Sequence, residues 1–177
     1  MVRCFIGFLL PDALKEKIVG VQEKVKNLPI VCKLVEKENL HINFSFLGEV
    51  SESKLETLKD RLKTVCSNVK TIKASVDGVK LVPSESFIRV IVLDVVSEDL
   101  QRLLEKIKDE VGGSIKPLHI TLCRVKKLEG SKESIVRKAK EMKFEKVDFY
   151  INSVCLIKSE LKRDGPVYTK LYESRLM

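Results

Sequence analysis

Two stretches of the sequence repeat one pattern, Asn39-Leu40-His41-Ile42-Asn43-Phe44-Ser45-Phe46 and Pro117-Leu118-His119-Ile120-Thr121-Leu122-Cys123-Arg124. In each stretch a histidine stands between a leucine and an isoleucine, and a small polar residue and then a large apolar residue follow. These are the only two histidines in the chain. Chance rarely gives both the same local frame, so the repeat predicts a duplicated structural unit with one histidine in each half.

Both stretches are typical of β-strands. Side chains at positions i and i+2 of a strand point to the same face, so His41 shares a face with Asn43, and His119 shares one with Thr121. The leucine and isoleucine beside each histidine can cover a hydrophobic core on the other face. Two-fold symmetry would then bring the two polar faces together across a cleft.

Four stretches repeat apolar residues at helical spacing, at 14–28, 55–69, 100–111 and 135–142. The sequence predicts Asp12 as the N-cap of the first helix. It predicts a capping box of Ser53 and Glu56 for the second. The third helix is expected to begin after Ser97 and to stop at Gly112-Gly113.

Runs rich in β-branched and aromatic residues predict strands near 2–10, 30–35, 40–47, 71–82, 86–95, 118–125, 146–158 and 166–174. Turns are expected at Pro83-Ser84-Glu85 and at Arg163-Asp164-Gly165. The order is roughly β-α-β-β-α-β twice, which favours an α+β fold with antiparallel sheets. No linker divides the halves, so we expect a single domain over residues 1–177.

The composition is that of an ordinary globular protein, with 44% hydrophobic and 33% charged residues. A net charge of +8 favours polyanionic partners. The five cysteines are scattered and include no C-x-x-C pair, so we expect neither a disulfide framework nor a zinc site, and a reducing cytoplasm is the simplest location. The apolar run at 4–10 is too short to span a membrane, and we expect no membrane association.

The paired histidine motifs suit phosphodiester chemistry without a metal ion. Phosphoryl transfer needs a base for the attacking oxygen, an acid for the leaving oxygen, and donors for the non-bridging oxygens. Two imidazoles can fill both proton roles near neutral pH. The hydroxyl of Thr121 and the amide of Asn43 can donate to phosphate oxygens. The alternative is that His41 and His119 are two partly buried strand residues without a chemical role.

With these motifs the chain resembles the two-histidine phosphoesterase superfamily, and most closely the archaeal and bacterial RNA 2',3'-cyclic phosphodiesterases once named 2'-5' RNA ligases. The resemblance covers essentially the whole chain. It implies a two-lobed arch with pseudo-two-fold symmetry, in which antiparallel sheets line a basic central cleft and helices lie outside. Besides the two motifs, the stretches that carry it are Arg3-Cys4-Phe5-Ile6-Gly7, Phe46-Leu47-Gly48-Glu49 and Gly165-Pro166-Val167-Tyr168.

The resemblance also implies roles for particular residues. His41 and His119 would be the catalytic pair, and Thr121 a phosphate ligand. Arg124 and Phe46 stand five residues after the two histidines. Arg124 would hold a phosphate, or be a plain surface charge; Phe46 would stack on a base or ribose, or pack in the core. Asn43 departs from the family, which normally has threonine or serine there.

The implied reaction is hydrolysis of RNA 2',3'-cyclic phosphate ends to 2'-phosphate ends, with 2'-5' ligation as a possible reverse activity. We favour His41 as the acid and His119 as the base, although pseudo-symmetry also allows the opposite order. No metal, ATP or other cofactor is implied. The expected partner is RNA with cyclic phosphate ends, such as tRNA fragments, and we expect a monomer. The alternative is a protein that binds RNA ends or nucleotides in the same cleft without turnover, which the Asn43 departure keeps open.

Overall fold

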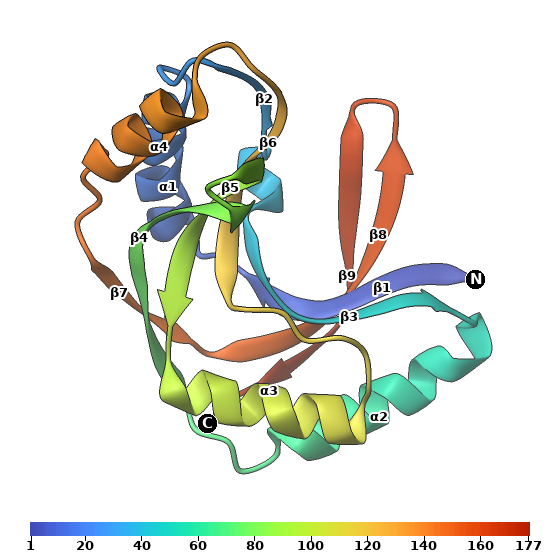
Figure 1. Ribbon diagram of the computed structural model, residues 1–177. Helices are drawn as coiled ribbons and strands as arrows, with labels where there is room; N and C mark the ends of the chain where they lie inside the picture. Colours follow the sequence, from blue (N-terminus) through green and yellow to red (C-terminus); the bar gives the residue numbers. More distant parts are fainter.

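The computed structural model describes residues 1–177 and contains one curled, entirely antiparallel sheet with four helices (Figure 1). The strand order is β7-β4-β5-β6-β3-β1-β8-β9, and β2 pairs with β6. In chain order the elements are β1 (Val2–Leu9), α1 (Asp12–Val25), β2 (Ile30–Leu34), the 3-10 turn η1 (Lys37–Asn39), β3 (His41–Val50), the 3-10 turn η2 (Glu52–Lys54), α2 (Leu55–Cys66), β4 (Ile72–Ser84), β5 (Phe87–Val96), α3 (Glu98–Glu110), β6 (His119–Leu128), α4 (Lys132–Glu141), β7 (Val147–Ile151), β8 (Ser153–Lys162) and β9 (Gly165–Arg175).

The pseudo-two-fold axis passes between the two histidine strands, β3 and β6. They pair only where Ile42 lies opposite Ile120, and both isoleucines are fully buried. On either side of this pair the strand order is equivalent, because β1, β8 and β9 follow β3 as β5, β4 and β7 follow β6. The predicted α+β fold, a two-lobed arch of antiparallel strands with outer helices, is confirmed.

The helices lie in two layers, one on each lobe. In Figure 1, α1 and α4 both lie toward the top of the molecule, and α2 and α3 lie side by side below. The two halves of the chain exchange helices, since α1 from the first half packs on β6 and α3 from the second half packs on β3. Each histidine strand is therefore backed by a helix from the other half.

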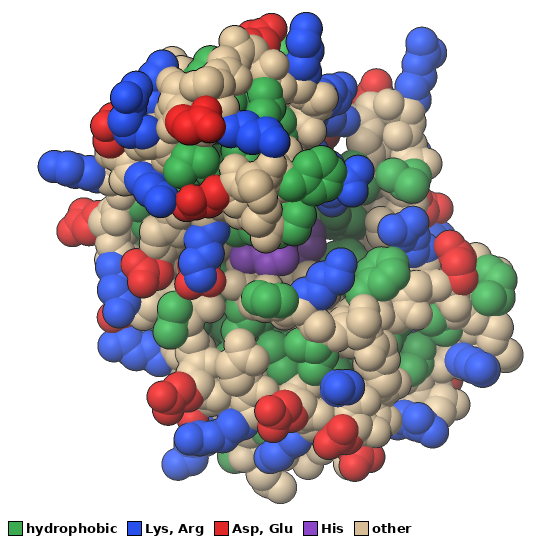
Figure 2. Space-filling model, in the orientation of Figure 1, with side chains coloured by type: hydrophobic (Ala, Val, Ile, Leu, Met, Phe, Trp, Pro, Cys, Tyr) green, Lys and Arg blue, Asp and Glu red, His purple; other side chains and the backbone are tan.

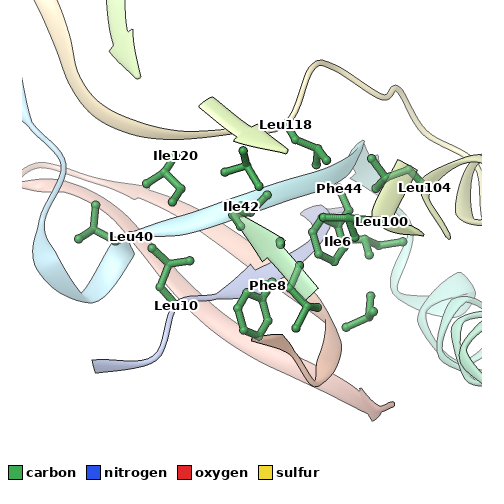
Figure 3. Packing of buried hydrophobic residues seen from close by; sticks show 14 of the residues in the cluster. Ile6, Phe8, Leu10, Leu40, Ile42, Phe44, Leu100, Leu104, Leu118 and Ile120 are labelled. Carbon is green, nitrogen blue, oxygen red and sulfur yellow. The ribbon is translucent and has the colours of Figure 1, made fainter. Parts of the chain in front are cut away.

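The core extends continuously beneath both histidine strands. Figure 3 shows Ile42 and Ile120 packed face to face at the axis, and Phe44 packed with Leu100 and Leu104 of α3. Burying one such side chain contributes about 1.5–3 kcal/mol relative to leaving it in water. The apolar side of each motif therefore anchors the strand, which leaves the histidine side free to face the cleft.

Of the three N-terminal helix caps predicted from the sequence, one is confirmed and two are wrong. The Ser97 hydroxyl accepts from the amide of Leu100 at 3.2 Å, which confirms that cap. The N-cap prediction for Asp12 is wrong, because Pro11 takes that position and Asp12 is the first helical residue. The capping box is also wrong, because Ser53 lies within η2 and its hydroxyl is bonded to that of Ser51.

The predicted helix end at Gly112-Gly113 and the predicted turn at Gly165 are confirmed, since all three glycines have positive φ. The first expected turn is displaced, because β4 continues to Ser84 and the turn falls at Glu85-Ser86.

The predicted strand at 146–158 is wrong in extent, because it is divided at Asn152 into two strands with different partners. β7 pairs with β4 at one end of the sheet, and β8 pairs with β1 and β9 at the other. The second half also lacks a full counterpart of β2, since only Ser114 bridges to Phe46. The pattern β-α-β-β-α-β is therefore complete only in the first half. All five cysteines are free thiols, and no helix is both long and apolar enough to cross a membrane.

Candidate active site

The predicted polar residues of the two motifs lie together on the concave face of the sheet. Extending the antiparallel register from the Ile42 and Ile120 pair sets His41 opposite Thr121 and Asn43 opposite His119. All four side chains are half-buried. Figure 2 shows the histidines at the bottom of a central hollow, with lysine and arginine side chains around it. The structure thus brings together four residues from two distant stretches.

The two imidazole rings are held in the same way. Nδ1 of His41 lies 2.7 Å from the carbonyl oxygen of Asn39, and Nδ1 of His119 lies 2.7 Å from that of Pro117. A carbonyl oxygen can only accept, so each Nδ1 carries a proton. In the neutral ring the lone pair is then on Nε2. Both histidines are therefore oriented to exchange a proton through Nε2.

The surroundings of His41 affect its protonation. Burial lowers the pKa of His41, and the positive charges of His119 and Arg124 lower it further, while the hydrogen bond to Asn39 acts in the opposite direction. His41 is therefore neutral in the free protein near neutral pH. When protonated, it gives up its proton more readily than an exposed histidine would.

Arg124 lies on the concave face near His41, where its charge affects both His41 and Tyr168. Its side chain is exposed, and it sits between Val90 of β5 and Lys33 of β2 in the sheet register. A cation in this position, unpaired with any carboxylate, is available to an anion in the cleft.

Phe46 is not a core residue, since 37% of its surface is exposed. It lies opposite Phe5 in the register of β1 and β3. The guanidinium carbon of Arg3 lies 5.3 Å from the centre of its ring, within the range of a cation–π contact. The core-packing alternative for Phe46 is therefore excluded, and its ring face is already shared with Arg3.

A cavity of about 410 Å³ adjoins His119. Its walls include Val82, Pro83 and Val92. At its margin an ion pair of 2.9 Å joins Lys80 to Asp94, which is the residue opposite His119 in β5. The volume lies within the range of ordinary ligand pockets, about 300–1,000 Å³. This cavity therefore has room for a small organic group next to His119, the one predicted site residue in its wall.

Three residues near His41 receive no role from the sequence motifs. The rings of Phe5 and Tyr168 lie 4.9 and 5.1 Å from the imidazole centre. Asn39 is buried and bonds both to His41 and to β9. Only one sequence signal pointed to Asn39: it stands two residues before His41, as Pro117 stands two residues before His119. Tyr168 lies far away in sequence, and no local pattern connects it to the site.

Comparison with known proteins gives the family. A family model described as LigT-like phosphoesterase matches twice, at residues 8–92 and 93–168, so that each match contains one histidine. An RNA 2',3'-cyclic phosphodiesterase of Methanocaldococcus jannaschii is 32% identical, covering 97% of this chain and 99% of the relative.

Solved structures agree with this result. TT0787 of Thermus thermophilus has a TM-score of 0.80 and 26% identity, covering 98% of this chain and 97% of that one. E. coli LigT, solved in complex with phosphate, shares the fold with a TM-score of 0.76 and 22% identity over 99% and 98% of the two chains. The resemblance inferred from the two motifs is confirmed, and the chain belongs to the LigT-like phosphoesterase family of enzymes.

Proposed function

We propose that this phosphoesterase hydrolyses 2',3'-cyclic phosphate ends of RNA to 2'-phosphate ends, with His41 and His119 as the catalytic pair. The observation that carries the proposal is the matched pair of imidazoles, each with Nδ1 held by a carbonyl and Nε2 left for proton exchange. Relatives that align over nearly their full length bear the name RNA 2',3'-cyclic phosphodiesterase.

In the proposed reaction, Nε2 of His119 takes a proton from water as the water oxygen attacks phosphorus. The bond between phosphorus and the ribose 3' oxygen breaks on the opposite side. Protonated His41 donates its Nε2 proton to that oxygen, which leaves a 2'-phosphate and a 3'-hydroxyl. The two rings end with exchanged protonation states, and solvent restores the starting state.

The acid role of His41 fits its surroundings. A lowered pKa makes the protonated ring a stronger acid toward the departing alkoxide. The bound phosphate is an anion, and it would offset the charges of His119 and Arg124 that disfavour the protonated ring. Substrate binding would therefore help to supply the acid in its active form.

The remaining predicted residues would stabilise charge on the phosphate. The Thr121 hydroxyl and the Asn43 amide can donate to its non-bridging oxygens, and Arg124 can neutralise them. Neither Thr121 nor Asn43 makes a side-chain hydrogen bond within the protein, so both are available to a ligand. Phe46 with Arg3 offers a surface for a base or ribose, and the cavity beside His119 has room for a nucleoside.

We propose that no metal ion or cofactor takes part. The donor set supports this, because no group of three histidine, cysteine or acidic side chains surrounds the site. Cys123 is not a candidate nucleophile, since burial raises the pKa of its thiol.

The reverse reaction joins a cyclic phosphate to a 5'-hydroxyl in a 2'-5' linkage, and we propose it as a side activity. We further propose that the protein acts as a cytoplasmic monomer on RNA ends such as tRNA fragments, for which its charge of +8 favours binding.

One incubation tests the central proposal. Purified protein is mixed with nucleoside 2',3'-cyclic phosphates and with RNA ending in a cyclic phosphate, in the presence of EDTA, and the products are separated by phosphate position. Accumulation of 2'-phosphate supports the proposal. Binding without turnover would instead support the alternative of an RNA-end binding protein, which the unusual Asn43 keeps open. Activity that EDTA abolishes and added metal restores would overturn the metal-independent mechanism.

A further inference from the structure

His41 sits in a cluster of three rings that has no counterpart at His119. Its ring centre lies 4.9 Å from that of Phe5 and 5.1 Å from that of Tyr168, which meets it edge-on at 83°. Phe5 and Tyr168 also touch each other, at 5.2 Å and 72°. These separations fall within the favourable range for aromatic pairs, about 4.5–7 Å. The imidazole is thus held from two sides, by β1 and by β9.

The Phe5 side of the cluster is tightly packed. Phe5 is only 4% exposed. A Cβ atom added at Gly7 would lie 3.3 Å from the Phe5 ring and 2.5 Å from the carbonyl oxygen of Ile42. Strand β1 therefore packs closely against β3, and Phe5 is buried beside His41. Tyr168, on the other side of the ring, is only half-buried.

Asn39 controls that side. It is a buried polar residue, 6% exposed, whose carbonyl oxygen accepts from Nδ1 of His41. Its side-chain amide donates to the carbonyl oxygen of Pro166 at 2.9 Å, across 127 residues of sequence. Pro166 lies two residues before Tyr168 on β9, on the same side of that strand. One residue therefore fixes the imidazole through its backbone and the strand of Tyr168 through its side chain.

The tip of the β8 and β9 hairpin is held on the same segment. Nζ of Lys33 donates to the carbonyl oxygen of Asp164 at 3.0 Å. Gly165 has a φ of +131°, and a Cβ atom there would lie 2.8 Å from Oε1 of Glu36. In Figure 1 the tip of this hairpin projects away from the rest of the sheet, and β9 contacts η1. The contacts at Lys33, Glu36 and Asn39 thus join the hairpin to the chain immediately before His41.

The other half of the pseudo-symmetric site lacks this arrangement. Nδ1 of His119 also bonds to the carbonyl two residues earlier, but that residue is Pro117, which has no side-chain donor. No aromatic ring packs on His119. Strand β7, the counterpart of β9, pairs only with residues 72–76 of β4.

We propose that Asn39 is a positioning residue for the reaction, which holds Tyr168 against His41 and so makes the two histidines unequal. This rests on the proposed role of His41 in proton transfer. A proton donor must be held in line with the leaving oxygen, and a displacement of about 1 Å can cost about 10²-fold in rate. Without the Asn39 amide, the Pro166 carbonyl loses its partner, β9 moves outward, and water reaches the imidazole.

The charged and titratable groups that face His41 are His119 and Arg124 from β6 and the Tyr168 hydroxyl from β9, with Arg3 and Glu36 beyond Tyr168. None of them is removed by a change at Asn39. Hydration of the ring would therefore raise the pKa of His41 toward its ordinary value.

The test compares Asn39→Ala and Tyr168→Leu with Tyr168→Phe, which keeps the ring. Matched controls are Asn152→Ala and Tyr150→Leu, exposed residues outside the site. On a cyclic nucleotide we expect Asn39→Ala and Tyr168→Leu to lose about 10- to 100-fold in kcat with KM within about threefold. Tyr168→Phe and both controls should stay within about threefold of the parent.

A second readout does not depend on activity. The chain has only two histidines, so proton NMR resolves both titrations, and His119→Ala assigns them. In Asn39→Ala and Tyr168→Leu the His41 resonance should titrate at higher pH than in the parent. An unchanged His41 titration in both folded variants would overturn the proposal, as would full activity in both. If the parent shows no cyclic phosphodiesterase activity, the proposed function fails, and the NMR titrations still decide whether Asn39 shields His41. Tyr168→Leu keeps the test valid if Asn39→Ala does not fold.

Discussion

Replacement of Asn43 tests whether the residue that departs from the family motif touches the substrate. Asn43 lies opposite His119 on the cleft face and opposite Gly7 on β1, where no side chain crowds it. Its side chain makes no hydrogen bond within the protein. Removing the amide in Asn43→Ala should therefore have little effect on stability and leave no buried group without a partner.

The expected loss of activity follows from the hydrogen bond that Asn43 can donate. A bond to a charged acceptor contributes about 1.5–3 kcal/mol, and a neutral bond about 0.5–1.5 kcal/mol. Since about 1.4 kcal/mol is a factor of ten in rate, Asn43→Ala should lose about 3- to 100-fold in kcat/KM. Asn43→Thr restores a donor closer to the backbone, as at Thr121, and should equal or exceed the parent.

The assay measures kcat/KM for both variants on one nucleoside 2',3'-cyclic phosphate, with Thr121→Ala as the matched change in the other half. Thr121→Ala should show a loss of similar size, because register places the two donors equivalently about the axis. Full activity of Asn43→Ala would show that Asn43 does not touch the phosphate. An inactive but folded Asn43→Thr would show that the asparagine has a role that threonine cannot fill.

Three further predictions follow from the geometry. His41→Ala and His119→Ala should each lower kcat about 10²-fold or more while the fold is kept, and near-full kcat in either would refute the paired mechanism. The pH profile of kcat/KM should be bell-shaped, because one ring must be protonated and the other neutral. The lowered pKa of His41 should place the acidic limb of this profile below pH 6.5. A flat profile from pH 5 to 9 with chemistry rate-limiting would contradict this. Gly7→Ala should lower Tm by about 2–12 °C, because its Cβ would meet the Ile42 carbonyl oxygen at 2.5 Å. Gly20→Ala, whose Cβ would meet nothing within 4 Å, should leave Tm unchanged. A single unfolding transition in both variants would support one domain over 1–177.

The sequence carried the fold class and the place of the histidines because both depend on local patterns. Alternation along two short strands determines which side chains face the core, and Ile42 and Ile120 are buried as expected. Helix stripes are equally local, and all four expected helices are present. The predicted helix caps at Asp12 and Ser53 were wrong because neighbouring residues changed where each helix begins. Pro11 takes the cap position before α1, and Ser53 lies within η2.

Choice of strand partner could not be read from the sequence. The run at 146–158 is apolar on both sides of Asn152, and nothing in it shows that β7 joins one end of the sheet and β8 the other. Apolar content reports burial, whereas pairing depends on the register of strands that are distant in sequence. The same limit explains why the sequence suggested two complete repeats where the second half lacks a strand equivalent to β2.

The sequence by itself therefore determined the pair of histidines, their polar neighbours and the near symmetry between them. Only the tertiary structure decided that the two are unequal, because the difference comes from residues that are distant along the chain. Tyr168 reaches His41 because β9 pairs with β8, and β8 with β1, which lies beside β3. Asn39 joins that strand by one hydrogen bond to Pro166, and burial lowers the pKa of His41.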